Sequence, residues 1–527
     1  MESITKSRLL DIKKCLFISL CLLMTDLICN ANNITVTNVV LSEPDTTAKT
    51  ADITFTVTWE NSWRVSASPS NWDAAWVFLK FQNVSTGNWE HLSINTSALA
   101  NSIDDGDSTY PNPKLDINND SGTGYGHGMF VYSDGSVDLN GDVSYNVSMA
   151  WDYEEDGVIS NDELNIRVYA IEMVYVPSGA FHLGSGGNET AHFYKYDDGS
   201  NTSDTYQVLS ENTISIEATK DSLFYDNGGE IADRGDAAVG IPVTIPANFP
   251  KGYSSFYCMK YEVTQGEYVN FINTLTDSQK ANRLEDDYNK PSTRNSISVV
   301  DGELYSSVPH VPFGRLQWAD LVAYFDWMAL RPITELEYEK LCRGIAAPVT
   351  GEFPWGTNQV SSEVYYSDVI NLINDLGSET EALDESIIDT SNATEGNANY
   401  ESVSGDEDGN VLRVGTYASY TNSIRASSGA TYYGIMNIAG NMRELWITIG
   451  NTTGRSFTGQ HGNGKIDTDG NADVLNWPGN DAIGTGLRGT SFKENGTLMR
   501  TSNRFSASKT FSIRSNYVSG RAGRTAN

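Results

Sequence analysis

The sequence predicts an α+β protein in which an all-β N-terminal part precedes a larger part that holds the helices. Two observations support this division. Alternating and β-branched runs fill residues 33–171 with no helical period. Apolar residues spaced about 3.6 apart, together with helix-capping patterns, occur only after Glu172.

The composition restricts the classes of function. The 527 residues are 39% hydrophobic and carry a formal net charge of −33, so the chain buries a core and presents an acidic surface. Because an acidic surface repels phosphate backbones, nucleic-acid binding is not expected. The charge is typical of a soluble, secreted protein, and carboxylates are also the ligands that divalent cations prefer.

Residues 1–31 are predicted to be a signal peptide. Basic residues from Lys6 to Lys14 precede an apolar run at residues 15–24, and Ala31 supplies a small residue for cleavage. A membrane span needs about 20 apolar residues, which neither this run nor any later segment provides. We therefore expect a secreted or extracytoplasmic protein without a membrane span.

The segments that predict strands in residues 32–171 either alternate apolar and polar residues or form short apolar runs. They are residues 34–40, 51–59, 74–81, 129–132, 143–149 and 164–171. Asn, Asp, Gly and Ser separate them, as expected for turns. Strands of this length and spacing predict an immunoglobulin-like β-sandwich domain over residues 32–171.

An acidic loop before the last of these strands has the spacing of an EF-hand calcium loop. Its candidate ligands are Asp152, Glu154, Asp156 and Glu163. The flanking segments read as strands, whereas an EF-hand loop joins two helices. The alternative is a solvated acidic turn between two strands.

Residues 172–527 contain the predicted helices. Thr264 with Glu267, and Thr334 with Glu337, form capping boxes that open two of them. Apolar residues over 318–328 recur at helical spacing and predict another.

Short motifs spread over this second part resemble the formylglycine-generating enzyme, or sulfatase-modifying factor, family, and they occur in the family's order. They lie at residues 173–185, 261–271, 331–339, 353–356, 397–400, 437–446, 487–492, 500–504 and 520–521. The resemblance implies a C-type-lectin-like fold for residues 172–527.

The resemblance also implies calcium sites. In that family a Gly-Asn-x-x-Glu turn binds calcium, which corresponds here to Asn441 and Glu444. Asn399, with Asp408 or Asp406, corresponds to a second site. Oxygen ligands of this kind suit a hard cation. The alternative for Asn441 and Glu444 is hydrogen bonding to loop amides.

The chemistry of the family's enzymes is not expected here. Those enzymes bind copper through two cysteines, and the matching positions hold Glu494 and Met499. No cysteine follows Cys342, and Cu(I) requires soft thiolates, so copper is not expected. The family's iron-dependent branch uses a histidine triad on a partner helical domain, and this chain lacks an H-x-x-x-H pattern. After signal cleavage Cys258 and Cys342 remain, either as one disulfide or as two buried thiols.

Two classes of function therefore stay open: a secreted binding module for a glycan or peptide, and a divergent metal-dependent oxidase or protein-modifying enzyme. Phe505 and Phe511, in an irregular stretch, are the expected exposed contacts of a binding module. Several arginines near the C-terminus either line a binding cleft or pair internally with carboxylates. They are Arg488, Arg500, Arg504, Arg514, Arg521 and Arg524.

Overall fold

The computed structural model describes residues 33–97, 101–106, 112–119, 124–225, 242–289, 294–361, 394–401, 411–418 and 424–526. Most of its regular structure is β-sheet, with a few short helices, which confirms the α+β prediction. The predicted signal peptide lies outside the described residues, as does Asp408. No helix of the described part combines the length and the apolar character that crossing a membrane would require.

The first sheet comes entirely from the N-terminal part. Its strands, in spatial order, are β1 (Thr35–Leu41), β2 (Thr50–Arg64), β10 (Leu139–Asp152) and β6 (Asn101–Asp104). Alternate residues of β2 are buried, among them Phe55, Val57 and Trp59. This burial follows the period-two pattern because successive side chains of a strand point to opposite faces.

The second sheet joins both parts of the chain. Its order is β21 (Arg331–Pro332), β27 (Ala522–Thr525), β18 (Phe256–Met259), β11 (Leu164–Val176), β3 (Asp73–Asn83), β9 (Met129–Ser133) and β7 (Pro113–Ile117), and β4 (Trp89–His91) also pairs with β3. One face of β3 packs Val77 and Leu79 against the first sheet. Its other face packs Trp76 and Phe78 into the core of the second part.

Strand β11 crosses the predicted boundary between residues 171 and 172. Its residues 164–174 pair with β3, and its residues 173–176 pair with β18. The two predicted parts therefore share one hydrogen-bonded sheet.

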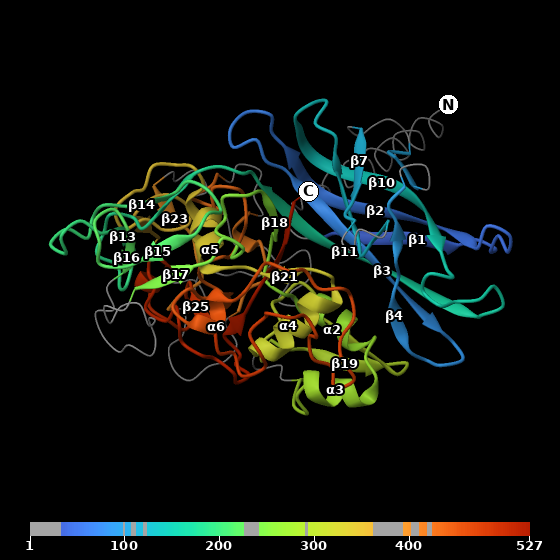
Figure 1. Ribbon diagram of the computed structural model, residues 1–527. Helices are drawn as coiled ribbons and strands as arrows, with labels where there is room; N and C mark the ends of the chain where they lie inside the picture. Colours follow the sequence, from blue (N-terminus) through green and yellow to red (C-terminus); the bar gives the residue numbers. More distant parts are fainter. Residues whose placement is uncertain are drawn as a thin grey trace, which may run out of the picture.

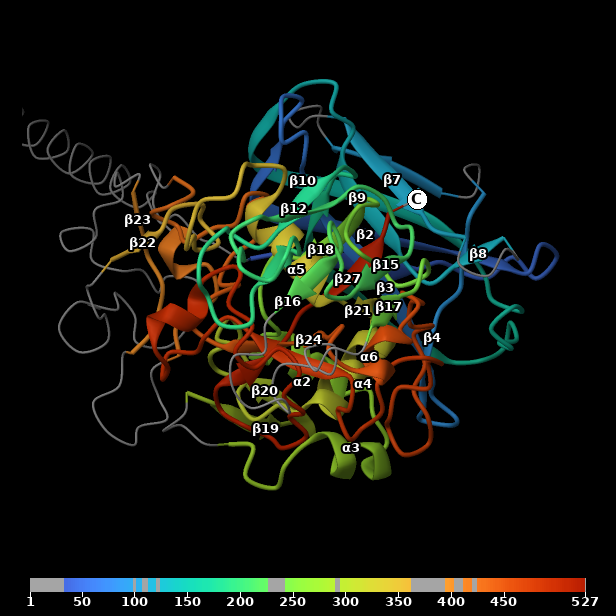
Figure 2. The ribbon, with the colours of Figure 1, turned by 60° about the vertical axis from the view of Figure 1, so that its left-hand side comes forward.

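The predicted helices are confirmed with their caps. They are α2 (Gln265–Ile272), α4 (Trp318–Trp327) and α5 (Glu335–Arg343). Thr264 caps α2 and Thr334 caps α5, each within a capping box. A further helix, α3 (Asp277–Arg283), has its own capping box at Thr276, which the sequence analysis missed. In Figures 1 and 2 the helices α2, α3 and α4 lie together in the lower part of the view, beside β19 (Ile297–Val300).

The remaining elements are short, and long loops join them. The strands are β5 (Ile94–Asn95) with β8 (Tyr125–Gly126), β12 (Phe181–Leu183) with β14 (Tyr206–Val208), β13 (Phe193–Lys195) with β16 (Leu223–Tyr225), β15 (Ile214–Ile216) and β17 (Val243–Ile245), β19 (Ile297–Val300) with β20 (Glu303–Ser306), β22 (Gln359–Val360) with β23 (Glu395–Gly396), and β25 (Thr485–Arg488) with β24 (Arg443–Ile447) and β26 (Val518–Ser519). The short helix α6 spans Thr452–Arg455.

Candidate functional site

The turn before β24 holds the residues predicted to bind calcium. Gly440 and Asn441 both have positive φ, 84° and 64°, as expected for a Gly-Asn turn. Asn441 is fully buried, and its amide oxygen accepts a hydrogen bond of 2.8 Å from the backbone N–H of Leu412. The same oxygen accepts one of 3.2 Å from the side chain of Asn399, so the structure brings these two predicted residues together.

Glu444 faces a cation of the protein itself. Both carboxylate oxygens accept hydrogen bonds from the Arg521 guanidinium, at 2.8 and 2.6 Å, and both side chains are buried. This bidentate pair uses the planar fork of the arginine. In this structure the side-chain oxygens of Glu444 and Asn441 accept N–H groups of the protein itself. Calcium at these residues stays a prediction.

Glu262 is a buried member of this site that the sequence analysis missed. Its Oε1 accepts a hydrogen bond of 3.2 Å from the Asn441 amide, and its Oε2 has no partner. Burial raises the pKa of Glu262 to about 8, against the opposing effect of Arg521. The sequence feature that could have identified Glu262 is its position as a charged residue between the apolar Tyr261 and Val263.

An ion pair lies at the position where the resemblance places the first copper cysteine. The Nη1 of Arg443 is 2.8 Å from the Oε1 of Glu494, with side chains 8% and 25% exposed. Glu494 Oε2 also accepts a hydrogen bond of 3.2 Å from the Ser491 hydroxyl. The main-chain N–H of Phe492 donates to the carbonyl of Asn441, which connects this loop to the turn described above.

No exposed thiolate is found among the described residues. The second position matched to a copper-binding cysteine holds Met499, and the two cysteines lie elsewhere. Met499 is fully buried within an apolar cluster. Cys258 and Cys342 are free thiols and both are buried, which answers the question of a disulfide. Burial raises the pKa of Cys342 to about 12, so its thiol stays protonated.

The C-terminal arginines are used for internal pairing. Arg504 and Arg488 both bind Glu335 at the start of α5, and Arg488 also lies 3.2 Å from Glu339. Arg514 pairs with Asp320 of α4 at 2.7 Å. Arg488, Arg504, Arg514 and Arg521 therefore pair with buried carboxylates, whereas Arg500 and Arg524 donate to the carbonyls of Gly351 and Ala329.

The acidic loop between β10 and β11 joins two strands, and its carboxylates bind separate groups of the protein. Asp152 accepts hydrogen bonds from Asn95 and Tyr125, both of 2.8 Å. Asp156 accepts one of 2.7 Å from the indole of Trp151. Glu154 lies 3.2 Å from Lys49.

Glu163 is exposed at the end of this loop. Across the described part of the chain, no group of three or more His, Cys, Asp or Glu side chains is placed to hold a metal ion. Calcium at this loop stays a prediction, beside the alternative of an acidic turn between two strands.

The two predicted aromatic contacts differ in exposure. Phe505 is 43% exposed, as expected. Phe511, also expected to be exposed, is only 8% exposed because it packs into the main core with Tyr517, at 6.3 Å between ring centroids. Phe511 is therefore a core residue, and the prediction that it is exposed is wrong.

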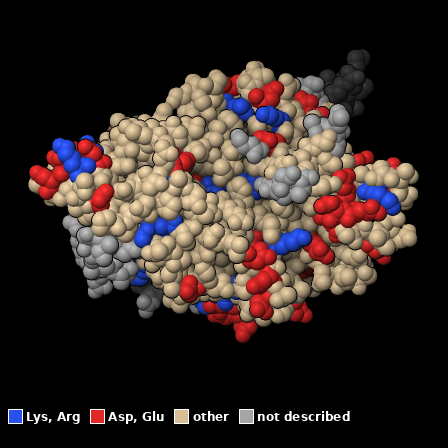
Figure 3. Space-filling view, viewed as in Figure 1, with Lys and Arg blue, Asp and Glu red and all other residues tan. Residues whose placement is uncertain are grey.

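Figure 3 shows acidic side chains more widely spread than basic ones on the face drawn.

Comparison with known families gives one match. Residues 227–515 match a family described as the sulfatase-modifying factor enzyme 1-like domain. The match covers more than half of the chain and includes Asn441, Glu444 and Glu494. No curated protein matches the chain.

Proposed function

The chain belongs to the sulfatase-modifying factor enzyme 1-like family, and from this premise we propose that it is a secreted binding module that has lost the family's copper chemistry. The observation that carries the proposal is the Arg443–Glu494 ion pair at the position matched to a copper-binding cysteine. Glu494 is held by Arg443 and Ser491, and its hard oxygens do not suit Cu(I).

The first test is the family's reaction. We expect the purified chain, supplied with copper, to leave a Cys-x-Pro-x-Arg sulfatase peptide unchanged, because Glu494 and Met499 cannot replace two thiolates. Mass spectrometry of the peptide measures the outcome, with an active formylglycine-generating enzyme as the positive control. Loss of the thiol with gain of an aldehyde would overturn the proposal.

The binding role is assigned to the loop surface that carries Phe505. Exposed aromatic side chains on ordered loops are frequent anchors of recognition. On a glycan and peptide array probed with the full chain, we expect a bound ligand whose signal falls about tenfold in Phe505→Ala. Leu475→Ala is the matched control, since Leu475 is an apolar side chain with 74% exposure in another loop. Absence of any ligand, or equal signals for Phe505→Ala and the unmodified chain, would count against this surface.

We also propose the finer features of the fold and location. An apolar core between the first sheet and β3 with β9 supports an immunoglobulin-like sandwich for residues 32–171. Family membership supports a C-type-lectin-like fold for residues 172–527. The basic and apolar pattern of residues 1–31 supports export from the cytoplasm.

A further inference from the structure

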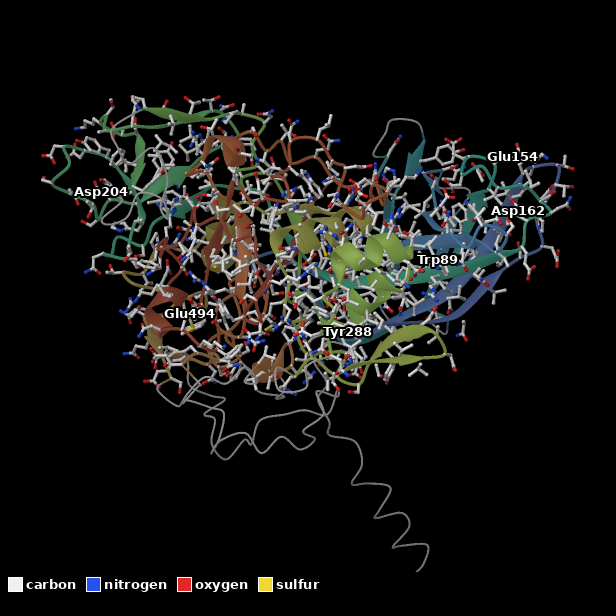
Figure 4. All side chains as sticks on the ribbon, turned by 90° about the horizontal axis from the view of Figure 1, so that it is seen from below. Trp89, Glu154, Asp162, Asp204, Tyr288 and Glu494 are labelled. Atoms are coloured by element: carbon white, nitrogen blue, oxygen red, sulfur yellow. The ribbon has the colours of Figure 1, made fainter. Side chains whose placement is uncertain are left out.

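A groove follows the junction between the N-terminal strands and the helices. It consists of three adjoining cavities of about 400, 490 and 180 Å³. Arg167 of β11 lines the first and second cavities, and Trp89 of β4 lines the second and third. In Figure 4 Trp89 lies where the yellow-green helices meet the blue strands, well apart from Glu494.

The third cavity is lined by a buried lysine, Lys80, which forms no ion pair with a carboxylate in the described part of the chain. Burial lowers the pKa of Lys80 well below its usual 10.5. Lys80 is 2% exposed, and its Nζ donates one hydrogen bond of 2.5 Å, to the carbonyl of Gly464. The acid acting on it at longer range is Asp326, whose carboxylate accepts backbone N–H groups from Asn463 and Asp473. Its Nζ also lies 4.9 Å from the ring centroid of Trp327, so its other protons face an aromatic ring and have no oxygen or nitrogen acceptor among the described residues.

His91 in the same cavity adds an unpaired acceptor. It is 3% exposed, and its Nε2 lies 2.6 Å from the carbonyl of His127, which requires Nε2 to carry the proton. Its Nδ1 is buried and has no partner. Burial and the charge of Lys80 both lower the pKa of His91, so Nδ1 is a neutral acceptor. A hydroxyl group is the complementary donor.

Two more lysines line the groove without an acidic partner among the described residues: Lys465 in the third cavity and Lys280 in the second. Trp89 between them is half-buried, with the Arg167 guanidinium 4.4 Å from its ring centroid. Arg167 also pairs with Glu303. Glu267, Glu303 and Glu90 also line these cavities. In a chain with a net charge of −33, lysines without an acidic partner in one groove favour an anionic ligand.

We propose that this groove binds an acidic saccharide. Its carboxylate or sulfate accepts N–H groups from Lys80 and Lys465, a hydroxyl donates to His91 Nδ1, and a sugar ring stacks on Trp89. Amide and charged side chains form most of the second cavity, whereas the first cavity is lined mainly by apolar side chains such as Val36, Phe78 and Ile171. The site goes beyond the proposed function, because neither Phe505 nor Glu494 lines its cavities.

The test is calorimetric titration of the full chain at low ionic strength. The probes are a galacturonic acid trisaccharide, dextran sulfate, neutral dextran and polyglutamate. We expect binding of the trisaccharide, the sulfate or both, weakened by added salt, and no binding of neutral dextran or polyglutamate. The first two probes distinguish a carboxylate from a sulfate ligand.

Variants connect the binding to these residues. We expect Trp89→Ala to weaken binding about tenfold, and Lys465→Ala and Lys280→Ala to weaken it severalfold. Lys220→Ala, which changes a surface lysine on another loop, is expected to bind as the unmodified chain does. Lys465 is exposed, so its variant tests the proposal even if Trp89→Ala does not fold.

Three results would overturn the proposal. They are no binding of either acidic saccharide, equal affinity in Lys465→Ala and the unmodified chain, and binding of polyglutamate as tight as that of the saccharides. The family's peptide reaction is independent of all three, and an array ligand bound through Phe505 keeps its signal in Lys465→Ala, so failure here is distinguishable from failure of the proposed function.

Discussion

Glu335→Gln is expected to lower the free energy of unfolding by about 3–5 kcal/mol, the cost of leaving a buried charge without its partner. Glu335 is 1% exposed and accepts hydrogen bonds from Arg504 at 2.8 and 3.0 Å and from Arg488 at 3.1 Å. Gln keeps the shape of the side chain but removes the negative charge between two buried guanidiniums. Urea unfolding measures the loss.

The control for this variant is Asp197→Asn, which breaks an exposed pair with Lys220 at 3.4 Å. A surface pair of this kind contributes about 0–1 kcal/mol. If Glu335→Gln and Asp197→Asn lose the same free energy of unfolding, the buried pair does not stabilise the fold more than the exposed one.

The free energy of unfolding should also depend on acid pH differently in Glu335→Gln and in the unmodified chain. Burial alone would raise the pKa of Glu335, but Arg504 and Arg488 outweigh it and hold that pKa below its usual 4.5. The stability that Glu335 contributes is therefore present above pH 4.5 and is lost as the pH falls through the lowered pKa. The unmodified chain should lose more stability than the variant over that window.

Lys260→Met is expected to cost a similar amount, about 3–5 kcal/mol, because it leaves two buried carboxylates without a cation. Lys260 follows β18, and its Nζ lies 2.8 Å from Glu172 of β11 and 4.0 Å from Asp73 of β3. These residues lie on both sides of the predicted boundary. Unfolding followed by tryptophan fluorescence and by circular dichroism measures the loss.

The penalty of Lys260→Met should increase with pH. Burial raises the pKa of Asp73 to about 7, while Lys260 opposes this rise. A raised carboxyl pKa contributes stability at low pH that is lost as the pH rises through it. Removing Lys260 raises that pKa further, so the variant should be most destabilised above pH 7. Lys195→Met, at a lysine 40% exposed and 3.8 Å from Asp221, is the control. A penalty independent of pH would contradict this account.

Local chemistry allowed the elements themselves to be predicted. Thr264 and Thr334 cap α2 and α5 through residues only three positions away, so the helix starts are encoded within one turn. The alternation of apolar and polar residues in β2 likewise follows from one buried face and one exposed face of the strand. The order of short motifs predicted the family, because each motif is contiguous in the sequence.

Only the tertiary structure decided the partners of the buried charges. Glu444 of β24 binds Arg521, which is 77 positions away. A carboxylate binds whichever cation the folded chain brings to it, and sequence spacing carries no information about that cation. The same reason explains Phe511, whose burial depends on packing against distant residues of the core, and β11, whose partners β3 and β18 come from both predicted parts.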